Sequence, residues 1–171
     1  MTIRIGTRRS KLALAQTAMV AASLKERFPG TEIQTVEIVT HGDRVLDKPL
    51  DKIGGKGVFV EEIEQAMRSG DIDIAVHSAK DLPVQLGEGL EIAGVLPRGD
   101  SRDMLITRRD SRYSVSDRFT VGTGSLRRRR NLAALYPNVD FADIRGNVDT
   151  RLRRLSDGEY DGIILCAAGI K

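Results

Sequence analysis

The sequence predicts an α/β fold of two lobes, because short apolar strands alternate with helices in two successive series along the 171 residues. A stretch punctuated by Gly and Pro, residues 86–97, separates the two series. The hydrophobic content of 40% is sufficient for packed cores. We therefore expect a first lobe over residues 1–95 and a second over residues 96–171. Paired lobes of this class bind a ligand in the cleft between them, where strand carboxyl ends and helix amino ends converge.

The first lobe is expected to begin with a short strand and a helix that Ser10 caps. Glu61 and Glu62 open the next long helix, where acidic side chains complement the positive end of the helix dipole. In order, we expect strand 3–6, a helix from Ser10 to Pro29, strand 33–40, a polar loop over 41–57, a helix around 59–67 and strand 72–76.

The second lobe repeats this alternation of strands and helices. Its last helix is expected to be capped by Asn147 and to pack through Val148, Leu152 and Leu155. In order, we expect strand 104–107, strand 119–121, helix 126–136, strand 139–144, helix 148–155 and strand 162–166.

The net charge of +3 conceals an uneven distribution of charge. Residues 117–154 contain nine arginines and four aspartates, which gives this segment a local charge of +5. Such a positive field favours an anionic ligand or partner. Because arginine alone supplies it, forked recognition of carboxylate or phosphate groups is favoured over diffuse attraction.

Composition argues against several other classes of protein. With one cysteine, Cys166, and two histidines, His41 and His77, an internal disulfide is excluded and no metal-ligand cluster has plausible spacing. We expect Cys166 to be a buried structural thiol, and we give neither histidine a catalytic role. No apolar run approaches the roughly 18 residues of a membrane span, and the first ten residues lack the apolar stretch of a signal peptide, so a cytoplasmic protein is expected.

The arginine run belongs to the stretch VGTGSLRRRR. Its glycines allow a tight turn, and a helix that starts near Ser125 presents free N–H groups and the positive end of its dipole. Arg127 and Arg128 lie in the first turn, where a cation is disfavoured unless an anion is bound there. We expect these two arginines to face the anion. Arg129 and Arg130 are expected to be solvated, because four consecutive residues spread around a helix.

A similar arrangement recurs in DIRGNVDTRLRRL, where a strand is followed by Arg145, Gly146 and a helix that carries Arg151. Arg151 projects away from the apolar stripe of this helix, so Arg145 and Arg151 could converge with the first arginine cluster. We expect Arg153 and Arg154 to be solvated.

The stretch AVHSAKDLP follows an apolar strand and carries Ser78, Lys80 and Asp81. A carboxylate that lies near a lysine in a cleft could donate or accept a proton. The alternative is that Lys80 and Asp81 simply form a turn.

The glycine-rich stretch DKIGGKGVF is not a phosphate-binding loop of the Walker type, because Leu50 and Gly57 stand where that motif needs glycine and Ser or Thr. It is either a mobile flap that brings Lys52 or Lys56 to an anion, or a flexible loop without such a role. Both alternatives stay open from these residues alone.

Seven stretches, in the same order, resemble the porphobilinogen deaminase family, also called hydroxymethylbilane synthase. They are IRIGTRRSKLALAQT, GDRVLDKPLDKIGGKGVFVEEIEQAM, DIAVHSAKDLP, PRGDSRDML, VGTGSLRRRRNLAALYP, DIRGNVDTRL and GEYDGIILCAAGI. The resemblance implies a three-domain enzyme whose first two domains are α/β lobes of the periplasmic-binding-protein-like type II fold. It also implies a transferase of tetrapyrrole (haem) biosynthesis that condenses four porphobilinogen molecules head to tail on a covalent dipyrromethane cofactor, with release of ammonia.

The resemblance assigns roles by motif position. Asp81 resembles the catalytic carboxylate, which assists loss of ammonia, stabilises the resulting cation through pyrrole N–H groups and assists removal of a proton after the carbon–carbon bond forms. The implied cofactor-binding residues are Ser78, Lys80, Asp81, Ser125, Arg127, Arg128, Arg145 and Gly146. The implied substrate-binding residues are Arg8, Ser10, Lys52, Lys56, Phe59 and Arg151. Each pyrrole unit carries an acetate and a propionate, so the many arginines suit a polycarboxylate.

The sequence departs from the family pattern in two places. Gly124 stands where the family has serine. The chain also stops at Lys171, before the third domain with the cofactor-bearing cysteine, and Cys166 does not match the glycine-rich context of that cysteine. We therefore expect an amino-terminal, truncated portion that lacks the third domain, cannot attach the cofactor and is inactive alone. The family is usually monomeric, and an apolar face exposed by truncation could allow a dimer.

Two other functions stay open at this point. A non-catalytic polycarboxylate-binding protein would have the same architecture without turnover. A nucleic-acid binder would show steep salt dependence and would lose binding when Arg129 and Arg130 are neutralised. Aromatic residues make up only 4% of the chain and none interrupts the arginine run, which argues against base stacking, so we expect neither a nucleic-acid nor a membrane partner.

Overall fold

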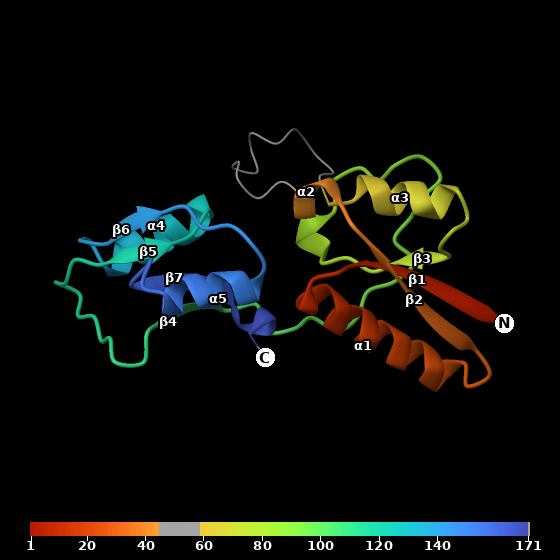
Figure 1. Cartoon of the computed structure of the whole chain (residues 1–171), viewed down its shortest axis with the longest axis horizontal. Helices are drawn as coiled ribbons and strands as arrows, with labels where there is room; N and C mark the ends of the chain where they lie inside the picture. The colour runs from red at the N-terminus through yellow and green to blue at the C-terminus, as the bar shows by residue number, and fades with distance from the viewer. Residues whose placement is uncertain (45–58, 171) are drawn as a thin grey trace. The chain divides into compact units, whose positions relative to one another are not determined.

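The computed structural model describes residues 1–44 and 59–170, and the chain divides into two compact units, Met1–Leu96 and Pro97–Lys171 (Figure 1). Each unit is built around its own sheet, with helices packed on the strands. The predicted α/β class with two lobes is therefore confirmed. Within the described residues, no helix combines the length and the apolar character needed to cross a lipid bilayer.

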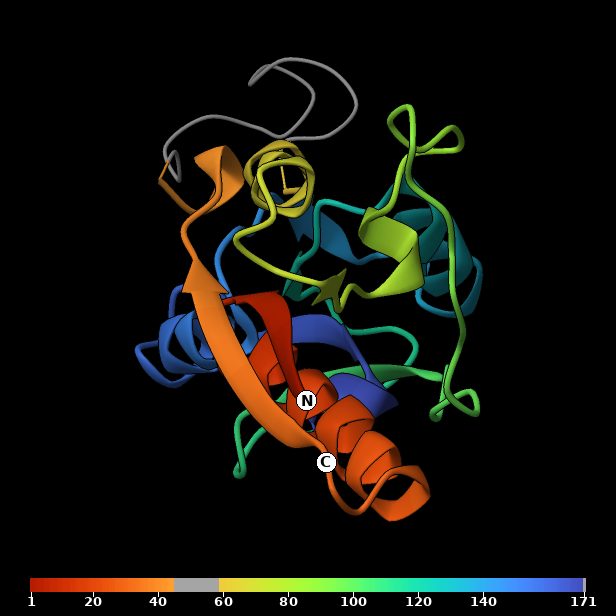
Figure 2. The same ribbon diagram turned by 90° about the vertical axis from the view of Figure 1, so that its right-hand side faces the viewer.

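The first unit has a three-stranded parallel sheet in the order β2-β1-β3. Its strands are β1 (Thr2–Arg8), β2 (Glu32–Ile38) and β3 (Ile74–Ala75), and its helices are α1 (Lys11–Arg27), α2 (His41–Arg44), α3 (Glu61–Arg68) and the 3-10 turn η2 (Ala79–Asp81). Helix α1 packs on β1 and β2, and α3 packs on β1 and β3. Figure 1 shows α1 and α3 on opposite sides of the strands, and Figure 2 shows β2, in orange, beside β1, in red.

Local sequence explains where the first long helix begins. The Ser10 hydroxyl oxygen accepts a hydrogen bond from the Ala13 backbone nitrogen, 3.2 Å away, which satisfies one of the free donors of the first turn. The predicted cap is therefore confirmed. Ile5 of β1, Ile63 of α3 and the nearby Ile72 are almost fully buried and belong to the apolar core of this unit.

The second unit has a four-stranded sheet in the order β4-β7-β5-β6. Its strands are β4 (Asp103–Thr107), β5 (Thr120–Gly122), β6 (Asp140–Ala142) and β7 (Gly162–Cys166), and its helices are α4 (Leu126–Leu135), α5 (Val148–Ser156) and the 3-10 turn η3 (Ala167–Gly169). Strand β4 runs antiparallel to β7, whereas β5 runs parallel to both of its neighbours.

Strand β7 contributes side chains to two separate cores. Ile164 packs with Val121 and Leu132, whereas Ile163 and Leu165 pack with Leu155 of α5. This division follows from the two-residue period of a strand, which directs successive side chains to opposite faces. The continuous apolar run GIILC is thus explained by a strand that is covered on both faces.

Four expectations about local structure were wrong. The expected polar loop after residue 40 begins instead with α2, and the expected strands over 72–76 and 139–144 are reduced to β3 and β6. Asn147 occupies the position before α5, but its side chain makes no capping hydrogen bond. Ends of short strands depend on their neighbours in the sheet rather than on their own sequence, which is why the apolar pattern overestimated both strands.

Candidate functional site

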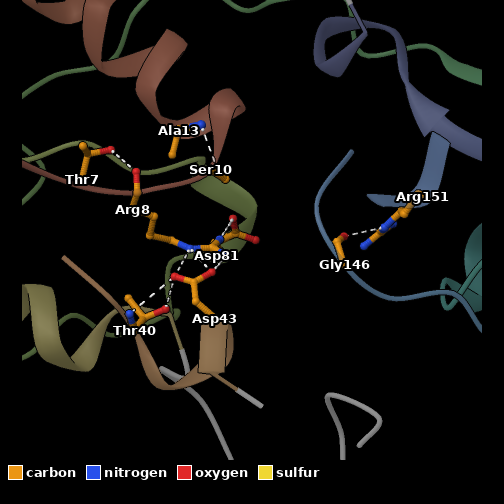
Figure 3. Close-up of polar contacts among 9 residues, drawn as sticks. All are labelled: Thr7, Arg8, Ser10, Ala13, Thr40, Asp43, Asp81, Gly146 and Arg151. Carbon is orange, nitrogen blue, oxygen red and sulfur yellow. Dashed lines mark hydrogen bonds and ion pairs between the residues drawn. The ribbon is translucent and has the colours of Figure 1, made fainter. Parts of the chain in front are cut away.

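The first group of site residues lies at the carboxyl edge of the sheet in the first unit. Arg8 is the last residue of β1, and Asp81 ends η2, which follows β3. Because β1 and β3 are neighbouring parallel strands, the segments that leave their carboxyl ends bring these two side chains together. Nη1 of Arg8 lies 3.9 Å from Oδ2 of Asp81, and the two side chains are 17% and 27% exposed (Figure 3).

A second carboxylate, Asp43 of α2, binds the other edge of the Arg8 guanidinium group (Figure 3). Nε of Arg8 donates to Oδ1 and Oδ2 of Asp43 at 3.2 and 3.1 Å, and Nη2 also donates to Oδ1. The guanidinium carbon lies 4.1 Å from the centroid of the Phe59 ring. That ring fills the space over Gly42, where an added Cβ would overlap it. Arg8 is therefore held along one edge and on one face.

Asp43 is negatively charged at neutral pH. Burial raises the pKa of its carboxyl group, but hydrogen bonds from Arg8 and Thr40 outweigh burial and hold this pKa below its usual value. Oγ1 of Thr40 donates to Asp43 at 2.7 Å, and the Thr40 backbone nitrogen lies 3.4 Å from the same oxygen. The sequence analysis gave Asp43 no role. The signal that could have found it is the Thr-x-x-Asp spacing of a capping box directly before α2.

Two serines predicted to bind ligand make contacts within the first unit, whereas the lysine predicted beside them is exposed. The Ser10 oxygen accepts its capping hydrogen bond, and Oγ of Ser78 donates to Oε1 of Gln16 at 2.9 Å. Gln16 was also missed by the sequence analysis, because nothing in its helical context distinguishes it. Lys80 is exposed.

His77 lies close to the Asp81 and Arg8 pair, although the sequence gave it no role. Burial lowers the pKa of its imidazole group, Asp81 raises it in part and Arg8 lowers it further. The lowered pKa makes His77 neutral at pH 7. Lys52 and Lys56 fall outside the described residues, so their predicted contact with substrate stays a prediction.

The second unit brings together three of its predicted arginines. Arg151 is partly buried, and its Nε donates to the carbonyl oxygen of Gly146 at 2.7 Å (Figure 3). Burial lowers the pKa of Arg151, and the positive charges of Arg128 and Arg145 lower it further. Nη1 of Arg145 is buried and has no hydrogen-bond partner among the described residues. A buried donor without a partner is costly, so this cluster is suited to an added acceptor.

Gly146 is required by the backbone between these arginines. Its φ of +104° lies in the region that residues with a side chain rarely adopt. An added Cβ would also lie 2.9 Å from Cγ2 of Thr150. Gly146 thus allows the tight turn that leads from Arg145 into α5.

Arg127 and Arg128 share one carboxylate, Asp103 of β4. Nη1 of Arg127 lies 2.6 Å from Asp103 Oδ2, and Nε of Arg128 lies 2.9 Å from Oδ1. Arg128 also donates to the carbonyl oxygen of Ile164 at 3.1 Å. Hydrogen bonds from Arg127 and then Arg128 lower the pKa of Asp103 despite its partial burial. Ser125 caps α4, because its Oγ accepts from the Arg128 backbone nitrogen at 3.4 Å.

The expectation that Arg129 is solvated was wrong. Its Nε and Nη2 atoms donate to the carbonyl oxygen of Thr123 at 3.0 and 2.9 Å, and Nη2 also binds Asp143. The guanidinium group lies over the ring of Phe141, 5.9 Å from its centroid. The first turn of α4 places Arg129 above the end of β5, which fixes it to the fold. Arg130 is exposed, as predicted.

Two further expectations need correction. Arg154 is not simply solvated, because its Nε donates to Glu159 Oε2 at 2.7 Å and its guanidinium lies 5.1 Å from the centroid of the Tyr160 ring. Arg153 is exposed, as predicted. Cys166 is only partly buried, and its thiol donates to the carbonyl oxygen of Asp100 at 3.3 Å. It lies at the end of β7, where the strand leaves the core.

Residues 3–171 match the family model described as "Porphobilinogen deaminase, dipyromethane cofactor binding domain". The chain belongs to the porphobilinogen deaminase family. It is 51% identical over 171 residues to the porphobilinogen deaminase of Roseiflexus sp. (strain RS-1), covering 99% of this chain and 56% of the relative. It is 46% identical over 169 residues to that of Geobacter sulfurreducens, covering 99% and 53%. The chain thus spans about half the length of the curated relatives it matches.

Among solved structures, the chain is similar to HinK, a LysR family transcriptional regulator from Pseudomonas aeruginosa. The TM-score is 0.52 at 14% sequence identity, and the match covers 98% of this chain and 52% of the regulator. At this identity the similarity concerns the fold alone.

The arginine cluster of the second unit fits the cofactor for which the family domain is described. A dipyrromethane carries acetate and propionate groups, which are acceptors for forked guanidinium donors. Among the described residues, Nη1 of Arg145 is buried without a hydrogen-bond partner, and burial together with the positive charges of Arg128 and Arg145 lowers the pKa of Arg151. Within this porphobilinogen deaminase domain, Arg128, Arg145 and Arg151 therefore have the chemistry to hold cofactor carboxylates.

Proposed function

We propose that the chain forms the cofactor- and substrate-binding part of a porphobilinogen deaminase (hydroxymethylbilane synthase). This transferase condenses four porphobilinogen molecules with release of ammonia. The observation that carries the proposal is the buried Nη1 of Arg145, which has no hydrogen-bond partner in the described part of the chain and lies near Arg128 and Arg151, in a domain whose family model is described as binding dipyrromethane.

The arginines and hydroxyls bind carboxylates in this proposal. Arg145 and Arg151 recognise carboxylates from the cluster in which they lie, and Arg127 is mostly exposed and can turn toward a ligand. Arg8 presents Nη1 on the side that Asp43 leaves uncovered. The remaining proposed binding residues are Ser10, Ser78, Lys80, Ser125, Arg128, Gly146, Phe59, Lys52 and Lys56.

Asp81 is the proposed catalytic carboxylate. In each condensation the bond between the aminomethyl carbon and nitrogen of porphobilinogen breaks and ammonia leaves. The carbon then bonds to a pyrrole carbon of the acceptor, which loses its proton. A half-buried carboxylate can accept hydrogen bonds from pyrrole N–H groups, stabilise positive charge on the substrate and take up that proton. The bound dipyrromethane supplies the first acceptor carbon.

Binding tests the ligand class. Calorimetric titration of the protein with porphobilinogen should detect binding, and Arg145→Gln or Arg151→Gln should weaken it about 10- to 100-fold, the range expected for a charge-assisted hydrogen bond. The control is Arg153→Gln, which changes an exposed arginine of the same helix as Arg151 and should leave affinity within about 2-fold. Equal effects of all three substitutions would contradict a defined carboxylate site.

Turnover tests the reaction. Full-length protein carrying these residues should release ammonia from porphobilinogen, and Asp81→Asn should reduce kcat by at least about 100-fold, the scale of general acid–base catalysis. Binding without ammonia release would instead support a non-catalytic polycarboxylate-binding protein. A monomeric state, a cytoplasmic location and the absence of nucleic-acid or membrane partners stay predictions.

A further inference from the structure

The guanidinium group of Arg8 lies between two carboxylates that it contacts unequally. Asp43 binds the edge formed by Nε and Nη2, with both carboxylate oxygens engaged. Asp81 faces only Nη1, and the distance of 3.9 Å is too long for a hydrogen bond. Among the described residues, Asp43 is therefore the main counter-ion of Arg8, and Asp81 is a distant neighbour.

Asp43 is itself fixed by the residue that precedes α2. Thr40 is fully buried, and its Oγ1 donates to Asp43 at 2.7 Å. The backbone nitrogen of Asp43 donates to the Thr40 carbonyl oxygen at 3.0 Å, which closes the turn. Phe59 covers one face of Arg8 and rests on Gly42, the residue before Asp43. These contacts limit the positions that the Arg8 guanidinium can take.

All three charged side chains are poorly exposed, at 17% for Arg8, 21% for Asp43 and 27% for Asp81. Charges with little exposure are screened weakly, so the single cation is attracted to both carboxylates. If Asp43 were neutral, Arg8 would gain by turning to Asp81 and forming a direct ion pair. The oxygens of Asp81 would then be occupied by guanidinium donors and less free to accept hydrogen bonds or a proton.

We propose that Asp43 is a positioning residue that holds Arg8 away from a direct ion pair with Asp81 and so keeps the Asp81 carboxylate available. The functional part of this inference rests on the proposed role of Asp81. The structural part does not, because it concerns only which carboxylate binds Arg8.

Hydrogen exchange at Arg8 tests the structural part in the absence of substrate. The Nε–H signal of Arg8 can be followed by nuclear magnetic resonance in the wild-type protein, Asp81→Asn, Asp43→Asn and the double variant. We expect Asp81→Asn alone to change exchange by less than about 2-fold and Asp43→Asn to accelerate it about 10-fold or more, the scale of a lost charge-assisted hydrogen bond. Adding Asp81→Asn to Asp43→Asn should accelerate it further, because Arg8 then loses its second partner.

Asp73→Asn is the matched control. It removes a forked carboxylate from Arg4, which lies on the same strand as Arg8, and should leave the Arg8 signal unchanged. Thr40→Val is the second variant, which loosens Asp43 without removing its charge and should accelerate exchange by a smaller factor. Thermal unfolding of each variant confirms that the fold is retained, and Thr40→Val decides the matter if Asp43→Asn does not fold. Equal effects of Asp81→Asn and Asp43→Asn, or no effect of Asp43→Asn or Thr40→Val, would overturn the proposal.

Kinetics test the functional part. In full-length enzyme, Asp43→Asn should lower kcat for ammonia release about 10-fold or more while KM changes by less than about 3-fold, because an occupied Asp81 impairs the chemical step. A raised KM with unchanged kcat would mean that Asp43 acts only through substrate binding. If the exchange result holds while the wild-type enzyme releases no ammonia, the proposed function fails and the arrangement of Arg8 stands.

Discussion

Arg151 donates a hydrogen bond to the carbonyl oxygen of Gly146, 2.7 Å away, although the positive charges of Arg128 and Arg145 both disfavour its own charge. A partly buried cation in such surroundings is maintained at a cost to the fold. Such a cost is what we expect of the carboxylate-binding cluster proposed above.

Removing this cation should therefore separate binding from stability. We expect Arg151→Gln to weaken porphobilinogen binding while its melting temperature stays the same or rises by about 2–4 °C, which corresponds to roughly 1 kcal/mol for a protein of this size. Calorimetric binding and thermal unfolding measure the two effects. A fall in melting temperature together with unchanged affinity would show that Arg151 has a structural role instead.

Removing the Asp103 carboxylate should have the opposite effects on binding and stability to those expected for Arg151→Gln. Its carboxylate neutralises Arg127 and Arg128, so Asp103→Asn should release both arginines toward a ligand and tighten polycarboxylate binding several-fold. The same change should lower the free energy of unfolding by about 1 kcal/mol, because two hydrogen-bonded ion pairs are lost and both arginines remain partly solvated. Weaker binding in the variant, measured by calorimetry, would show that Asp103 orients the arginines rather than competing for them.

Asp73 should give the first unit a distinct response to acid. Hydrogen bonds from the side chain and backbone of Arg4 lower the pKa of Asp73 to about 2. For a carboxyl group with a lowered pKa, the stabilisation is complete above the unfolded value of 3.8 and is lost as pH falls through the folded value. Thermal unfolding of Asp73→Asn should therefore differ from that of the wild type above about pH 4, and the two should converge as pH approaches 2. A difference that persists at pH 2 would contradict the ion pair as its cause.

Gly42 should tolerate no side chain. An added Cβ would overlap the Phe59 ring, so Gly42→Ala should cost about 1–3 kcal/mol of unfolding free energy and disturb Arg8, which packs on that ring. Gly30→Ala is the matched control, because its Cβ would meet nothing within 4 Å. Denaturant unfolding compares the two, and equal stabilities would show that the ring moves aside freely.

Sequence alone was informative where the determinants are local. Ser10 and Ser125 were expected at the starts of helices, and both accept the capping hydrogen bond, because a cap involves residues only three positions away. The two-sided burial of β7 likewise follows from its uninterrupted apolar run.

Contacts between distant segments were not predictable in the same way. Arg129 is fixed by Asp143 and Arg8 by Asp43, and each pair is 14 or more positions apart in the chain. A run of arginines looks uniform in the sequence, yet its members differ according to which strand end or carboxylate the fold brings beside them. The long-range contact of Asp43 with Arg8 could not be read from the sequence, although its local capping contact with Thr40 could have been.

The order of strands in the second unit also determines how that unit can be assembled. Strand β7 is the last strand in the chain, but it lies between β4 and β5 and is the only described partner of β4. During synthesis, β4 and the edge of β5 that pairs with β7 therefore stay unpaired until residues 162–166 leave the ribosome. Nascent chains that pause before this point should depend on chaperones, whereas chains that have passed it can close the sheet in a single cooperative step.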